Sequence, residues 1–138
     1  MPMIERLPDW EQRLHDYVAS LEGSSFRWGE LDCALFAAGA VLAQTGVDLA
    51  AAYRGRYTTA RGSVRALRRL GAGTLEATIA AALPAVAPAF ARRGDVVMSD
   101  GIAGVCLGPR AIFVGEVDGT PGWVTVERAS WVNAWSVG

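Results

Sequence analysis

The sequence predicts an α+β fold in which N-terminal helices pack on a small C-terminal antiparallel β-sheet or partial barrel. Apolar residues recur at three- and four-residue spacing over the first two thirds of the chain, and short β-like runs fill the last third. The hydrophobic content of 51% is enough for a sizeable core. No internal repeat or linker-like tract interrupts the sequence, so we expect one domain over 1–138, with a helical part over 1–91 and a β part over 92–138.

Five segments of the first part have the pattern of helices. Residues 8–22 carry one apolar stripe, whereas residues 33–45 are apolar nearly all round, which is typical of a buried central helix. Asp32 can cap this second helix, and Gly46 can end it. The remaining predictions are a short helix and turn within 48–57, an amphipathic helix over 59–70 and an Ala-rich helix over 75–83.

The helix predicted over 59–70 has an arginine-rich side. We interpret this side as a solvated face, and contact with an acidic partner surface is the alternative. The arginines concerned are Arg61, Arg65, Arg68 and Arg69.

The chain changes character after Arg93, where runs bounded by Gly, Pro, Asp or Asn replace the helical spacing. Pro84 and Pro88 break the last helical pattern before this change. The predicted strands cover residues 95–98, 103–107, 111–114, 123–126 and 134–137.

Composition argues against several classes of function. With 13 basic residues, all arginine, against 14 acidic ones, the net charge of −1 leaves no positive excess for nucleic-acid binding. No apolar run is long enough to span a membrane, and Glu5 and Arg6 interrupt the opening segment where a signal peptide would be apolar. The two cysteines have no metal-ligand spacing, so we expect reduced thiols, no metal and no cofactor.

The segment from Phe26 to Phe36 carries the most informative chemistry, because it places Cys33 in the first turn of the predicted buried helix. The helix dipole and free backbone N–H groups there are expected to lower the pKa of the thiol and favour thiolate. The same N–H groups could form part of an oxyanion hole. The alternative is that Cys33 is a small core residue and Asp32 only an N-cap.

Asp32 and Cys33 at a helix start are followed by Gly94 to Val96 on one predicted strand and Gly104 to Gly108 on the next. This order resembles NlpC-type cell-wall peptidases, which have a papain-like fold. A second set of motifs consists of Trp28, Gly29, Asp32 and Cys33, the segments 45–48 and 53–57, the Arg93–Gly94–Asp95 step, and Ala134 with Trp135. With these the chain is more similar still to an uncharacterised family of small proteins encoded among phage and prophage tail genes. The resemblance implies a papain-like, NlpC-type domain with Cys33 at the nucleophile position. It implies structural or pocket roles for Trp28, Asp32, Gly94, Asp95 and Gly104.

One departure from active peptidases affects the expected activity. The resemblance places Ile102 where those enzymes have the histidine that activates the thiol, and isoleucine accepts no proton. The sole histidine, His15, lies on the polar side of the first predicted helix. Because loss of the base can lower the rate by about 10⁶, we expect Cys33 to be vestigial and the chain not to be a working hydrolase.

The resemblance therefore implies a structural or assembly protein of a phage-type tail, near the tail tip. Expected partners are other tail proteins of the hub, distal tail or tape-measure type, in the virion tail or in the host cytoplasm during assembly. Trp131 and Trp135, close to Val132, are predicted to be exposed anchors of the interface, with core positions as the alternative. The alternative functions are a cysteine-dependent cell-wall amidase or peptidase delivered with the tail, and a factor that binds a host enzyme.

Overall fold

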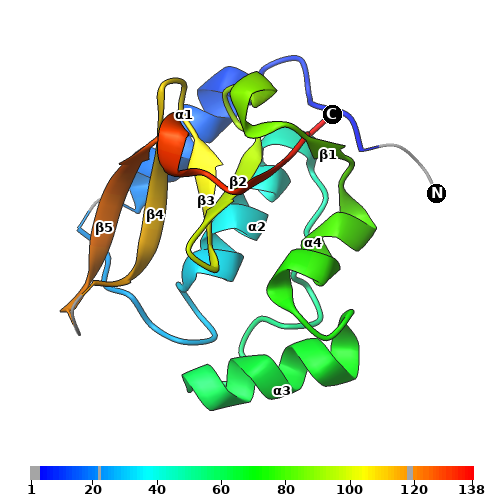
Figure 1. Ribbon diagram of the computed structural model, residues 1–138, viewed down its shortest axis with the longest axis vertical. Helices are drawn as coiled ribbons and strands as arrows, with labels where there is room; N and C mark the ends of the chain where they lie inside the picture. The colour runs from blue at the N-terminus through cyan, green and yellow to red at the C-terminus, as the bar shows by residue number, and fades with distance from the viewer. Residues whose placement is uncertain (1–3, 22, 118–119) are drawn as a thin grey trace.

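The computed structural model describes residues 4–21, 23–117 and 120–138, and it confirms the α+β class (Figure 1). Four helices are followed by one six-stranded antiparallel open sheet. The helices are α1 (Trp10–Ser20), α2 (Cys33–Thr45), α3 (Ala60–Leu70) and α4 (Leu75–Ala82). The strands are β1 (Ala85–Val86), β2 (Val96–Ser99), β3 (Ile102–Cys106), β4 (Arg110–Val117), β5 (Thr120–Glu127) and β6 (Asn133–Trp135), and two 3-10 turns are η1 (Pro88–Phe90) and η2 (Arg128–Ser130).

Helix α2 is the central element, as its apolar pattern predicts. The Asp32 carboxylate accepts a hydrogen bond from the Leu35 N–H at its start, and Gly46 ends it in a left-handed conformation. Most of its side chains are buried between the sheet and the other helices. The predicted caps and bounds of this helix are therefore confirmed.

The other helical predictions are confirmed with one exception. α1, α3 and α4 lie within the predicted segments, although Glu22, the predicted end of the first helix, is outside the described residues. The short helix predicted within 48–57 is wrong, because this segment is a series of turns. The Asp48 carboxylate accepts hydrogen bonds from the Ala50 N–H and from Arg54, which favours turns over a continuous helix. None of the described helices has the length and hydropathy needed to cross a bilayer.

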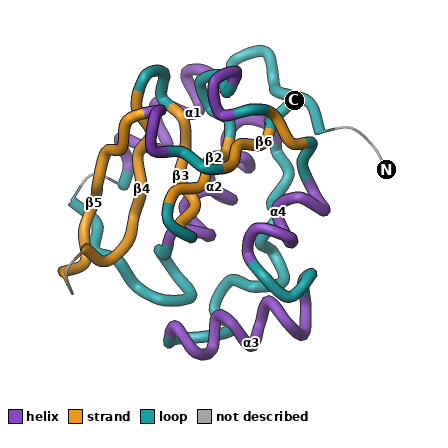
Figure 2. Tube along the Cα trace, viewed as in Figure 1, coloured by secondary structure: helices purple, strands orange, loops and turns teal. Residues whose placement is uncertain are grey.

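The sheet has the strand order β1-β6-β2-β3-β4-β5, so β6 lies between β1, labelled in Figure 1, and β2, labelled in Figure 2. All five predicted strands are present with small shifts of their ends. Strand β1 was not predicted, since two residues are too few to show alternation, and it pairs with β6 inside the part expected to be helical.

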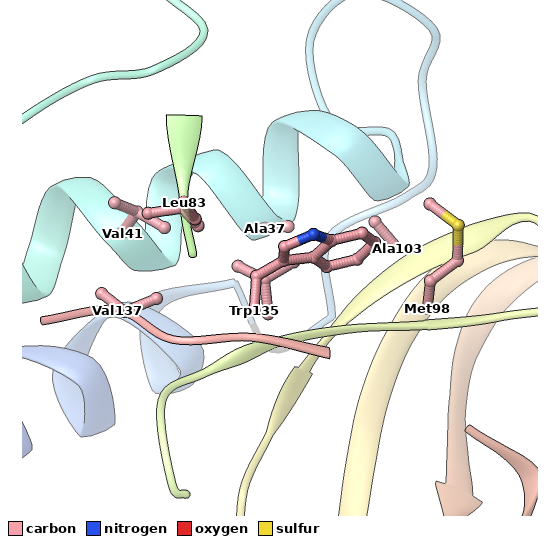
Figure 3. Packing of buried hydrophobic residues seen from close by; sticks show 8 residues of the cluster. Ala37, Val41, Leu83, Met98, Ala103, Trp135 and Val137 are labelled. Atoms are coloured by element: carbon pink, nitrogen blue, oxygen red, sulfur yellow. The ribbon is translucent and has the colours of Figure 1, made fainter. Parts of the chain in front are cut away.

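Each face of the sheet has its own apolar layer. On the α2 side, the Trp135 ring lies between α2 and the sheet beside Ala37 and Met98 (Figure 3). On the opposite side, Trp131 packs against Phe113 under the two 3-10 turns. Trp135 and Trp131 are only 2% and 5% exposed, so the expectation that they are exposed is wrong and the alternative of core positions is confirmed.

A buried polar network joins the two ends of the described chain to this core. The Arg6 guanidinium pairs with the Asp95 carboxylate at 2.9 Å and donates to the Gln44 Oε1 at 3.0 Å. Asp95 also accepts from the Val137 N–H, and the Gln44 amide donates to the Gly94 carbonyl. Asp95 is 1% exposed, so loss of its cationic partner would leave a buried charge uncompensated.

We expect Arg6→Met to lower the free energy of unfolding by about 3 kcal/mol, the size typical of breaking a buried ion pair. Arg13→Met is the matched control because Arg13 and Asp9 form an exposed i,i+4 pair, with both side chains more than half exposed. That control should cost less than about 0.5 kcal/mol. Urea denaturation of the three proteins measures both effects, and equal losses would contradict the structural role of Arg6.

Candidate functional site

The Asp32 carboxylate organises the region around Cys33. One oxygen caps α2 at the Leu35 N–H, at 3.0 Å. The other accepts from the Gly29 N–H at 3.0 Å and from the Tyr57 hydroxyl at 2.6 Å. Asp32 is 1% exposed, so these three donors replace water around a buried acid. Burial, followed by this hydrogen bond, raises the pKa of Tyr57.

Gly29 holds the turn before α2 against the segment that contains Tyr57. Its φ of +80° suits glycine, and a Cβ there would overlap the Tyr57 carbonyl oxygen. The Gly29 carbonyl accepts a hydrogen bond from the Gly55 N–H at 2.8 Å. Two turns far apart in the sequence are thus joined beside the start of α2.

A cavity of about 460 Å³ opens next to Cys33 and is called the Cys33 cavity below. Its walls come from α2, the turns of 49–57, α3 and α4, and Gly101 of the β2–β3 turn borders it. Most of the lining is apolar, as at Leu67 and Ile79. Trp28 contributes a half-buried ring that meets Phe26 edge to face.

The expected low pKa of Cys33 is wrong. Burial raises the pKa of the Cys33 thiol above its ordinary value, and the Asp32 charge acts in the same direction. Backbone N–H groups of Ala103 and Ala34 favour thiolate but do not offset the burial. The helix start therefore holds a neutral thiol at neutral pH.

Neither Ile102, the position where the catalytic histidine is expected, nor His15 lines the Cys33 cavity. Ile102 packs with the apolar layer on the face of the sheet opposite α2, and its neighbour Ala103 is the β3 residue on the Cys33 side. His15 is exposed on α1 and borders a second cavity of about 420 Å³ together with Trp123.

The remaining predicted site residues have structural contacts. Asp95 and Gly94 belong to the polar network at the end of α2, where a Cβ on Gly94 would overlap the Gln44 Oε1. Gly104 pairs with Phe113, whose ring covers it. The structure thus brings Trp28 and Asp32 to Cys33 but places Gly94, Asp95 and Gly104 elsewhere in the core.

Sequence reasoning missed Tyr57 as the partner of Asp32, and Arg6 and Gln44 as partners of Asp95 and Gly94. Tyr57 lies 25 residues from Asp32 in the chain, beyond any local pattern. The one signal in the sequence was that Asp32 and Tyr57 both lie in segments that carry the resemblance described above.

We expect the alkylation rate of Cys33 by iodoacetamide to rise only at alkaline pH, with a midpoint above the free-thiol value of about 8.5. Asp32→Asn should move this midpoint downward, because it removes a negative charge that disfavours thiolate. Asp48→Asn is the control, since Asp48 pairs with Arg54. Peptide mapping by mass spectrometry separates Cys33 from the buried Cys106. A midpoint below the free-thiol value would contradict the burial effect.

No curated protein matches the sequence. Among the described residues, no group of three or more His, Cys, Asp or Glu side chains could hold a metal ion. Residues 5–137 match the family described as Domain of unknown function (DUF6950), and the chain therefore belongs to this family.

Proposed function

We propose that the protein is a structural or assembly protein of a phage-type tail, near the tail tip, with a catalytically degenerate NlpC-type fold. The observation that carries this proposal is the surroundings of Cys33, the residue that the resemblance places at the nucleophile position. Cys33 is a half-buried thiol with a raised pKa, its neighbours Asp32 and Tyr57 bond to each other, and the sole histidine borders another cavity. These features support a role in binding over one in hydrolysis.

A surface suited to protein contact lies on the side of the sheet opposite α2. Phe90 and Val132 are 74% and 69% exposed, the highest values among the exposed large hydrophobic side chains of the described residues. Phe90 is the last residue of η1, and Val132 follows Trp131 at the end of η2. We call these two residues, together with the two turns, the η1–η2 ridge. They take the place of Trp131 and Trp135 as interface candidates.

The η1–η2 ridge is held rigidly from within. The Arg128 guanidinium donates to the Pro88 and Ala91 carbonyls at 2.7 and 3.0 Å, which ties η2 to η1. It also lies over the Trp131 ring, 4.7 Å from the centroid. A surface fixed in advance loses little conformational entropy when a partner binds. The proposed partners are the hub, distal tail or tape-measure proteins, in the assembled virion tail or in the host cytoplasm during assembly.

We expect the purified protein to bind at least one of these three tail proteins. Replacing both Phe90 and Val132 by Ser should weaken that binding about tenfold or more, as for central interface residues. Val47→Ser is the control, because Val47 is also exposed but follows α2, away from the ridge. Binding assays with purified hub, distal tail and tape-measure proteins measure the change. A stable monomer that binds none of them would contradict the proposal.

The second candidate is a cysteine-dependent cell-wall amidase or peptidase. It is favoured by one observation, that Cys33 lines a cavity large enough for part of a substrate. Under the tail-assembly proposal, muropeptides incubated with the protein remain intact, and Cys33→Ala changes nothing. Muropeptide turnover, followed by chromatography and lost in Cys33→Ala, would establish the amidase instead.

A further inference from the structure

The walls of the Cys33 cavity suit an apolar ligand. Ala38 of α2, Val64 and Leu67 of α3 and Ile79 of α4 line it. At the Cys33 end, the Asp32 carboxylate and the Tyr57 hydroxyl already bond to each other, so they offer few free polar groups. Burial of an apolar chain is the main interaction that such walls provide.

Of the arginines on helix α3, only Arg68 borders the cavity. Arg68 lines the cavity, and Arg61, Arg65 and Arg69 follow the same helix, all four being exposed. Within the described residues, none of these four arginines takes part in a salt bridge. Helical spacing puts residues 61, 65 and 68 on one stripe beside Val64. The opening thus has an unneutralised cationic edge that complements an anionic group.

The orientation of α3 argues against a bilayer surface as the source of that anion. An interfacial helix needs its apolar side turned outward to the membrane. Here Ala66 is buried and Val64 and Leu67 line the cavity, so these three side chains are directed toward the protein or its cavity, whereas Leu70 is 53% exposed. Figure 1 shows α3 as the outer wall of the helical region, with α4 beside it.

We infer that the Cys33 cavity binds a free anionic amphiphile, a single alkyl chain ending in a carboxylate, with the chain against the apolar walls and the carboxylate at Arg68. The size of the cavity sets the chain length. A methylene group takes up about as much room as a water molecule, roughly 30 Å³, so about 460 Å³ accommodates a chain of about 15 carbons.

Titration calorimetry with saturated fatty acids from octanoate to hexadecanoate, below their micelle concentrations, tests the inference on the unaltered protein. Each added methylene should tighten binding about fourfold, until the chain fills the cavity near about 15 carbons. Dodecanol and dodecyltrimethylammonium should bind more weakly than dodecanoate. Bound dodecanoate should also slow the alkylation of Cys33, which lines the same cavity.

A matched pair of variants tests the position of the carboxylate. Arg68→Gln should weaken dodecanoate binding up to about fivefold, as expected for an exposed ion pair, and should leave dodecanol binding unchanged. Arg69→Gln removes the same charge one residue away, outside the cavity lining, and should change binding less than about twofold. Ala38→Leu should reduce binding of both ligands by filling the cavity, with thermal unfolding as the check that it folds.

Three results would overturn the inference. The first is an affinity that does not depend on chain length, and the second is an equal effect of Arg68→Gln and Arg69→Gln. The third is binding to phosphatidylglycerol vesicles that dodecanoate does not compete away, which would assign the arginines to a membrane surface. The chain-length series needs no variant, so it decides the matter even if Ala38→Leu fails to fold.

Discussion

The buried Asp32 carboxylate is the interaction on which the rest of the site depends. A carboxylate with 1% exposure is stable only when its oxygens are hydrogen-bonded, and here the donors are the Leu35 and Gly29 amides and the Tyr57 hydroxyl. These three bonds start α2, fix the turn before it and hold the 49–57 turns against it. The position of the Cys33 thiol and one end of its cavity follow from them.

The same arrangement explains why the pKa of the Cys33 thiol is raised. A helix start lowers the pKa of a cysteine thiol, whereas apolar surroundings raise it. Cys33 is instead surrounded by apolar walls and lies next to the Asp32 charge, and both disfavour thiolate. The start of a buried helix can thus hold a cysteine whose surroundings favour the neutral thiol, a side chain suited to packing or binding.

Local features were predictable, and contacts between distant segments were not. The bounds of α2 followed from Asp32 and Gly46, and the strands followed from short apolar runs between turn residues. The turns of 48–57, by contrast, depend partly on the Gly55 bond to Gly29, which tertiary packing supplies. Trp131 and Trp135 are buried because each joins an apolar layer on one face of the sheet, and these layers form only in the folded chain. The prediction of a low pKa for Cys33 was wrong for the same reason, because residues distant in the chain remove water from around the thiol.

The place of β6 in the sheet has a consequence for biosynthesis. This strand comes last in chain order but pairs with both β1 and β2. Until β6 has been made, β1 has no pairing partner and the side of β2 away from β3 stays open. Completion of this side of the sheet therefore comes after synthesis of all its other strands. The nascent chain exposes an unpaired strand edge meanwhile, which makes chaperone binding or aggregation the competing fates.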